Sequence, residues 1–138
     1  MNGTPSPGPP ASSAPTVFGP VPSRRLGQSL GIGNVLPKTC TYSCVSCQVG
    51  PTPATEIDPR AIWPSGVVVE AVTRHVEKLR ARGERVDYIT FVPDGEPTLD
   101  RDLGEEIDGL RSLGIPIAVI SNGSLVWRPE VRAALGKA

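Results

Sequence analysis

Apolar residues recur at helical spacing in two long stretches of the chain. In the first stretch they step by four, four and three residues, at Val68, Val72, Val76 and Leu79. This spacing puts them on one face of a helix. We predict Ser65 as the N-cap of this helix and Gly83 as its stop.

The second stretch steps by four, four, three and three residues, at Leu99, Leu103, Ile107, Leu110 and Leu113. The same reasoning predicts one helix over these residues, despite Gly104 and Gly109, with Gly114 at its end. A last helix is predicted from Pro129 to the end of the chain at Ala138.

Three further segments have the residue types and patterns of strands. Residues 29–36 (SLGIGNVL) form a short apolar run closed by a proline, residues 86–92 (VDYITFV) are β-branched and aromatic, and residues 115–120 (IPIAVI) are continuously apolar. A continuous apolar run suits a strand that is covered on both faces. Prolines and glycines punctuate residues 17–28, which we therefore expect to be irregular.

The predicted order is strand, helix, strand, helix, strand, helix. This order is typical of an α/β protein with a parallel sheet and right-handed crossovers, here about three strand–helix units. Ligands of such sheets bind beyond the carboxyl ends of the strands. A polar motif follows each predicted strand: a cysteine loop, then DGEP, then SNG. We therefore expect these three motifs to meet at one end of the sheet.

Composition limits the chain to one domain and names no partner. Residues 1–16 are nearly all Pro, Gly, Ser, Ala and Thr, a tail that we expect to be disordered, and residues 17–138 form the predicted domain. Acidic and basic residues balance at 14 each, so charge predicts no nucleic-acid partner. The sequence has no membrane-length apolar run and no signal peptide, and we expect a cytoplasmic protein.

All three cysteines of the chain, Cys40, Cys44 and Cys47, lie within one polar loop. An odd cluster of thiols in a reducing compartment points to metal or redox chemistry. An iron–sulfur cubane held by three thiolates keeps one iron open, because such a cluster normally takes four. A zinc site would need a fourth ligand, and we expect the single histidine, His75, to be structural because it borders an apolar helix face.

The cysteine spacing C-x3-C-x2-C after the first predicted strand, with GEP after the second, resembles the radical S-adenosylmethionine (radical SAM) superfamily. The segments FGPVPSRRLGQSLGIGN and FVPDGEPTLD further resemble the subgroup of the wyosine tRNA-base synthesis enzyme. The resemblance implies a partial TIM-type radical SAM barrel and activity in tRNA-base modification. It covers the chain from Val17 onward.

The resemblance also implies roles for individual residues. Cys40, Cys44 and Cys47 would ligate three irons of a 4Fe–4S cluster, and S-adenosylmethionine would chelate the fourth. Gly95 and Glu96 would hold the amino group of its methionine moiety, while Ser121 and Asn122 would hold the carboxylate. The implied reaction takes one electron from an external donor and cleaves S-adenosylmethionine to methionine and a 5′-deoxyadenosyl radical, which abstracts hydrogen from a substrate.

The sequence departs from the family pattern at two motif positions. Ser46 stands where the family usually has an aromatic residue near the adenine, which removes a stacking surface of order 1 kcal/mol. Asp94 stands where many members have a first glycine. Arg24 and Arg25 have two open interpretations, either solvated side chains or contacts to a phosphate or to the cofactor carboxylate.

The length of the chain is the larger departure. Superfamily cores have roughly twice as many strand–helix units as the chain supplies, so we expect the N-terminal half of a radical SAM core, completed by a missing C-terminal half or a partner chain. An alternative is a non-catalytic metal-binding or electron-transfer module holding zinc or an iron–sulfur cluster. Only the enzyme hypothesis gives the GEP and SNG motifs a use.

We predict that the 138-residue chain alone turns over no substrate, because half a barrel lacks most of a substrate pocket. Anaerobic incubation of the reconstituted chain with S-adenosylmethionine and dithionite, followed by chromatography, would test this. Sustained production of 5′-deoxyadenosine by the purified monomer would contradict it.

Overall fold

The computed structural model describes residues 14–36, 57–64, 66–93 and 95–138. The strands are β1 (Thr16–Ser23), β2 (Gly27–Gly33), β3 (Tyr88–Phe91) and β4 (Ile117–Val119), and they form one sheet in the order β1-β2-β3-β4. β1 pairs antiparallel with β2, whereas β2, β3 and β4 run parallel. This mixed α/β architecture agrees with the predicted class. The assignment of its elements to three barrel units stays a prediction, as does the disordered tail, most of which lies outside the described residues.

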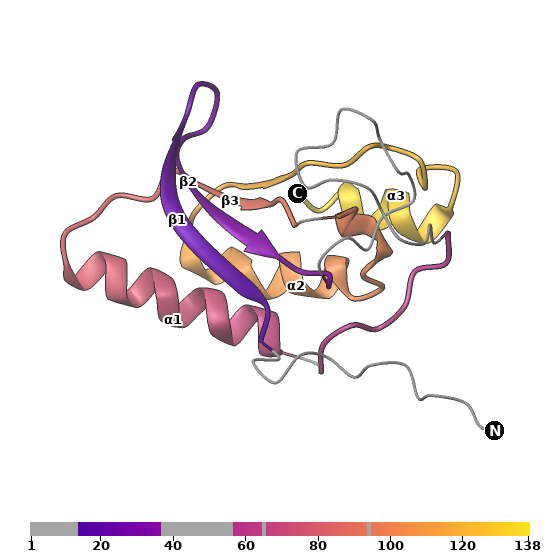
Figure 1. The fold of residues 1–138 in the computed structure, drawn as a ribbon, viewed down its shortest axis with the longest axis horizontal. Helices are drawn as coiled ribbons and strands as arrows, with labels where there is room; N and C mark the ends of the chain where they lie inside the picture. The colour runs from indigo at the N-terminus through magenta and orange to yellow at the C-terminus, as the bar shows by residue number, and fades with distance from the viewer. Residues whose placement is uncertain (1–13, 37–56, 65, 94) are drawn as a thin grey trace.

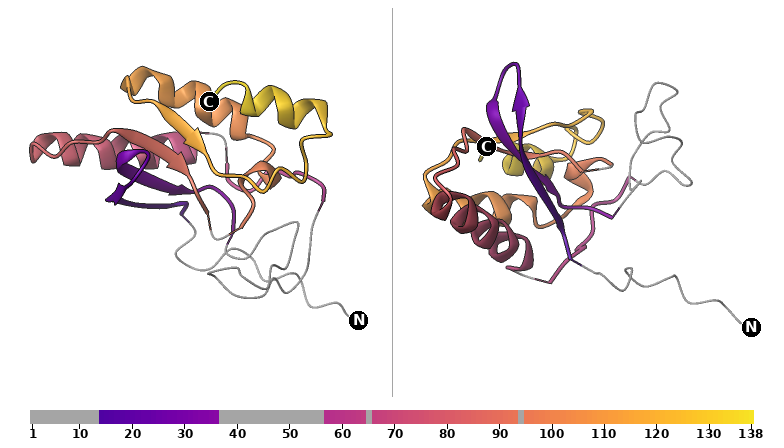
Figure 2. Two further views of the ribbon diagram at one scale, coloured as in Figure 1. Left: turned by 90° about the horizontal axis from the view of Figure 1, so that it is seen from above. Right: turned by 60° about the vertical axis from the view of Figure 1, so that its left-hand side comes forward.

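The helices are α1 (Val67–Ala81), α2 (Leu103–Leu110) and α3 (Pro129–Leu135), with short 3-10 turns η1 (Pro97–Leu99) and η2 (Arg111–Leu113). Helices α1 and α2 lie side by side on one face of the sheet (Figure 1). Figure 2 shows the same layering from two further directions. No helix in the described part of the chain is long and apolar enough to cross a membrane.

The core lies between the sheet and these two helices. Alternate residues of β2 and β3 point into it, and they pack against the apolar stripes predicted for the helices: Leu30, Ile32, Ile89, Phe91, Val68, Val72, Val76, Leu79, Leu103, Ile107 and Leu110. Gly109 allows the two helices to approach closely, since a Cβ at this position would lie 2.8 Å from Val69 Cγ2. Gly109 is therefore required by the packing of α2 against α1.

The prediction that residues 17–28 are irregular was wrong, because they contribute to a β-hairpin. β1 lies at the edge of the sheet, where prolines such as Pro20 and Pro22 are tolerated, since an edge strand leaves half its N–H groups unpaired. The register shifts between Phe18 and Val21, where Gly19, the residue before Pro20, takes a positive φ of 102°. Proline and glycine content therefore marked an edge strand with a bulge.

Two further predictions need correction. The expected single helix over residues 99–113 is divided: Leu99 ends η1, α2 begins at Leu103, and η2 follows α2. The last strand was expected to be covered on both faces, but all of β4 is only half-buried and Ile120 beyond it is 55% exposed, because β4 is the other edge of the sheet. The N-cap of α1 is Gly66; the predicted cap, Ser65, lies outside the described residues.

Candidate functional site

The carboxyl ends of the three parallel strands lie level with one another. Ile32 of β2 pairs with Phe91 of β3, and Phe91 pairs with Val119 of β4. The segments that follow these strands therefore start at one edge of the sheet. They are the segment that begins with Asn34, the turn around Gly95 and Glu96, and the SNG motif at Ser121.

Glu96 joins the segments after β3 and β4. Its side chain is buried, with 1% exposure. One carboxylate oxygen, Oε2, accepts from Ser121 Oγ at 2.8 Å and from the backbone N–H of Thr98 at 3.1 Å, and also from the Thr98 hydroxyl. The other oxygen, Oε1, accepts from the backbone N–H of Asn122 at 2.8 Å. The structure thus brings three of the predicted site residues into one hydrogen-bonded cluster.

The predicted site residues in this cluster bond to one another. Ser121 Oγ donates to Glu96 and accepts from the Gly123 N–H at 3.0 Å. Asn122 uses its backbone for Glu96, and its Oδ1 accepts from the Ser124 N–H at 2.9 Å. Glu96 therefore fixes the backbone of two loops in addition to any contact with a ligand.

Thr98 belongs to this cluster and was missed by the sequence reasoning. It donates twice to Glu96, which is the N-cap of η1, with Pro97 at the first position of the turn. An acceptor side chain followed by proline is a signature of a helical N-terminus. The letters EPT carried this signal, although the ligand-binding interpretation of GEP hid it.

A second buried cluster lies beside the first and joins β2 to α2. The Nδ2 group of Asn34, which is fully buried, donates to Pro97 O and to Asp100 Oδ2, both at 3.1 Å. Asp100 also accepts from the Asp102 N–H at 2.9 Å and interacts with the side chain of Glu106. Asp100 and Glu106 are 3% and 6% exposed.

Glu106 is the member of this carboxyl pair that holds the proton. Burial, and then its hydrogen bond with Asp100, raises the pKa of Glu106 to about 10; the nearby carboxylates of Asp102 and Glu105 act in the same direction. Burial also raises the pKa of Asp100, but the hydrogen bonds that Asp100 accepts oppose this effect. Because Asp100 faces more donors, it carries the charge and the Glu106 carboxyl donates to it. The sequence signal was an acid placed three residues after Leu103 on an apolar stripe.

The predicted cluster ligands Cys40, Cys44 and Cys47 lie outside the described residues, as do Ser46 and Asp94. Among the residues that are described, no three His, Cys, Asp or Glu side chains are grouped so that they could hold a metal ion. The described part of the chain thus offers no competing metal site.

Arg24 and Arg25 lie in the turn between β1 and β2 and are exposed. This turn precedes β2, at the end opposite to the candidate site, and the hairpin projects from the rest of the fold (Figure 1). Their placement favours the solvated interpretation over contact with a cofactor at the carboxyl ends of the strands.

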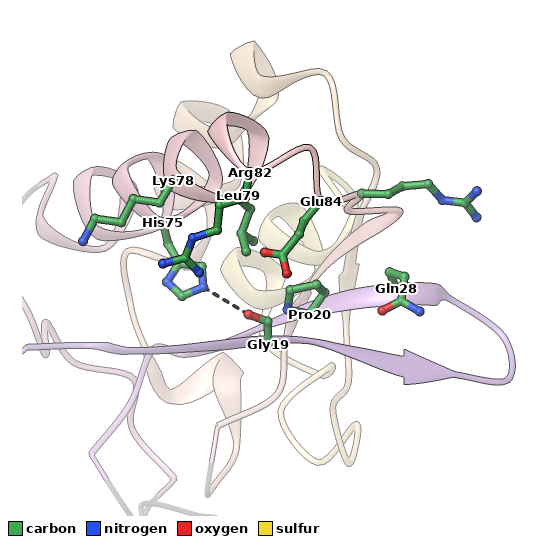
Figure 3. A pocket seen from close by; sticks show the side chains of 9 residues that line it. Gly19, Pro20, Gln28, His75, Lys78, Leu79, Arg82 and Glu84 are labelled. Carbon is green, nitrogen blue, oxygen red and sulfur yellow. Dashed lines mark hydrogen bonds between the residues drawn. The ribbon is translucent and has the colours of Figure 1, made fainter.

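A hollow of about 700 Å³ lies near the amino ends of the strands, away from these clusters (Figure 3). His75 Nε2 donates to Gly19 O there at 3.2 Å, which agrees with the structural role predicted for the histidine. The lining carries both charge signs, with Lys78 and Arg82 beside Glu84. We find no chemistry in this hollow that matches the sequence motifs.

Comparison with known proteins identifies a family for most of the chain. The family model of the Radical SAM superfamily matches residues 34–138. No solved structure gives a significant match.

Three curated relatives show the extent of the similarity. A UPF0026 protein of Methanocaldococcus jannaschii is 50% identical over 115 residues, which are 83% of this chain and 35% of that protein. A protein named GTPase Obg, of Brachyspira hyodysenteriae, is 38% identical over 120 residues, 86% of this chain and 17% of that protein. A UPF0026 protein of Helicobacter pylori is 35% identical over 124 residues, which are 88% of this chain and 39% of that protein. The chain therefore spans well under half the length of these relatives.

Replacing Glu96 by Gln should lower the free energy of unfolding by about 1–3 kcal/mol. Each carboxylate oxygen accepts from one backbone N–H, and a backbone donor cannot turn to accept from an amide NH₂. Urea denaturation would measure the loss, with Glu105→Gln on the exposed side of α2 as the matched control. Equal stability of the two variants would contradict a stabilising role for the hydrogen bonds of Glu96.

The protonated state of Glu106 predicts a pH dependence of stability. Its folded pKa is raised, so between its usual unfolded pKa and about 10 the folded state binds one more proton, and stability falls as pH rises, by at most about 1.4 kcal/mol per pH unit. Glu106→Gln cannot lose this proton, so its stability should fall less between pH 6 and pH 9. Thermal denaturation at both pH values would test this, with Glu77→Gln on the exposed side of α1 expected to behave as wild type. A Glu106→Gln protein as pH-sensitive as wild type would refute the assignment.

Proposed function

The chain belongs to the radical SAM superfamily, and on this premise we propose that it holds a 4Fe–4S cluster on Cys40, Cys44 and Cys47 and binds S-adenosylmethionine. The observation that carries the proposal is the Glu96 cluster, which ties together the loops after β3 and β4. In the sequence the cysteines follow β2, whose carboxyl end lies at the same edge of the sheet.

The donor set fits an iron–sulfur cluster. Three thiolates suit iron in a sulfide cluster, since both metal and ligand are soft, and three ligands leave one iron open for a substrate or cofactor. When bound and reduced, such a cluster supplies the electron for cleavage of S-adenosylmethionine. Thiol ligands of this kind need a reducing compartment, so we place the protein in the cytoplasm.

The Glu96 cluster fits a methionine moiety in two ways. Oε1 of Glu96 accepts from Asn122 alone among the described residues, so this oxygen keeps a lone pair for an ammonium group. Gly95 has no side chain to block the approach of a ligand to the backbone. Ser121 and Asn122, held by Glu96, are our candidates for contacts with the carboxylate of the same moiety.

For the substrate we propose a base in tRNA, as the wyosine-type motifs imply. Trp127 supports this class, because its indole is 61% exposed and Arg128 lies over the ring at 4.6 Å from the centroid. Arg128 also bonds Ile57 O, so this pair lies beside the segment that follows the cysteines. An exposed aromatic ring with a stacked guanidinium is a surface on which unpaired bases stack.

We further propose that substrate turnover needs more chain than these residues. β4 is an open edge of the described sheet, and Ile120 next to it is exposed. An additional segment or partner that pairs with β4 would cover both. The alternative is a metal-binding or electron-transfer module. In such a module the buried hydrogen bonds of Glu96 to the loop after β4 would serve stability alone.

Anaerobic reconstitution with iron and sulfide should give a cubane signal in the electron paramagnetic resonance spectrum of the reduced protein. Adding S-adenosylmethionine should change this signal, because the fourth iron gains a ligand. Cys44→Ala is the control and should form little or no cluster. If the wild-type spectrum does not change when S-adenosylmethionine is added, the electron-transfer module is favoured. If the protein binds stoichiometric zinc and forms no cluster, a zinc module is favoured.

A further inference from the structure

Two described residues that flank the cysteine segment in the sequence, Asn34 before it and Arg60 after it, are bonded to the same short turn. Asn34 donates two hydrogen bonds of 3.1 Å, to Pro97 O and to Asp100 Oδ2. Arg60 N–H donates to Leu99 O at 3.0 Å, and Arg101 N–H donates to Arg60 O at 2.9 Å. The three cysteines lie between these two anchors in the sequence.

The turn that receives these anchors, residues 97–101, also fixes the GE motif. Thr98 N–H donates to the side chain of Glu96, and Leu99 N–H donates to Glu96 O at 3.2 Å. A shift of the turn would therefore move Glu96 and, through it, the loop at Asn122. One turn thus contacts Asn34 and Arg60, which flank the cysteine segment in the sequence, and also the proposed methionine-binding residue Glu96.

Asn34 has no other evident reason to be a buried polar residue. It directly follows β2 and is fully buried, and burying an amide costs free energy unless its groups are hydrogen-bonded. Both hydrogens of its Nδ2 group are donated to the turn, to Pro97 O and to Asp100 Oδ2, whereas its Oδ1 has no hydrogen-bond partner among the described residues. The side chain of Glu106, on α2, also interacts with Asp100, the acceptor of the second hydrogen bond.

We propose that Asn34 is a positioning residue. It holds the turn at residues 97–101, and with it Glu96, in a fixed position relative to the end of β2, and so determines the affinity for S-adenosylmethionine. Asp100 and Glu106 support Asn34 in this role. This role rests on the proposed function. It lies outside the cofactor motifs, since the hydrogen bonds of Asn34 to described residues go to Pro97 and Asp100 and not to Glu96.

Ser29 provides a matched control on the same strand. It is 6% exposed, and its hydroxyl bonds Thr90 Oγ1 at 2.7 Å across β2 and β3. Replacing Ser29 by Ala removes a buried hydrogen bond of β2 without touching residues 95–101. A purely structural role of Asn34 would make Asn34→Ala and Ser29→Ala behave alike.

The first measurement uses the chain without cluster. Hydrogen exchange of the Thr98 and Leu99 amides should quicken by about tenfold in Asn34→Ala, because one lost buried hydrogen bond is worth about that factor, and should match wild type in Ser29→Ala. Asn34→Ser keeps one donor and should give an intermediate rate; it serves also if Asn34→Ala fails to fold. The effect of about tenfold is a lower bound for Asn34→Ala, because that substitution removes both hydrogen bonds of Asn34.

The second measurement titrates S-adenosylmethionine into the reconstituted proteins. Asn34→Ala should bind about tenfold more weakly than wild type, while Ser29→Ala should stay within about twofold. If wild type forms a cluster but does not bind S-adenosylmethionine, the proposed function fails. The role assigned to Asn34 then fails as well, even if Asn34→Ala speeds hydrogen exchange of the Thr98 and Leu99 amides. If wild type binds and both variants bind equally, the role of Asn34 alone is overturned.

Discussion

The site depends on one buried carboxylate that accepts four hydrogen bonds from three residues. Glu96 lies after β3, and Ser121 and Asn122 lie after β4, so the bonds hold together two loops that only adjacent parallel strands bring within reach. A buried carboxylate is costly unless its oxygens are satisfied. The hydrogen bonds that satisfy the buried Glu96 carboxylate are the same bonds that fix both loops. The geometry of the candidate site is therefore a consequence of folding.

The second buried cluster extends this constraint to β2. Asn34 and Asp100 join the end of β2 to the turn after Glu96, and Glu106 supplies the proton that lets two carboxyl groups lie together. Two charged carboxylates at this distance would repel in a poorly solvated interior, and a shared proton removes the repulsion. Three strand ends are thus connected through hydrogen bonds that have little access to water, so each bond is more directional and more costly to break.

The sequence predicted those parts of the fold that periodicity determines. The apolar stripes of α1 and α2 and the residue types of β2 and β3 appear in the structure as expected, because each reports burial on one known face. Features set by tertiary context were missed: Pro20 and Pro22 suggested irregular chain until β1 proved to be an edge strand, and β4 looked buried because composition does not reveal an edge. Of the site, GEP and SNG were found by motif. Asn34 was not, since its hydrogen-bond partners are distant in sequence and leave no local pattern. Thr98 and Glu106 had local signals, but these did not reveal their partners.

The polar residues of the site divide into those that can meet a ligand and those that hold them. Under the proposed function Glu96 belongs to both groups, because Oε2 accepts from Ser121 and Thr98 while Oε1 accepts from one donor among the described residues. A single side chain with one saturated and one unsaturated oxygen can position a loop and still accept from an ammonium group. Ligand binding at Oε1 would then need no movement of the loops, so the free energy of the contact would not be spent on ordering them.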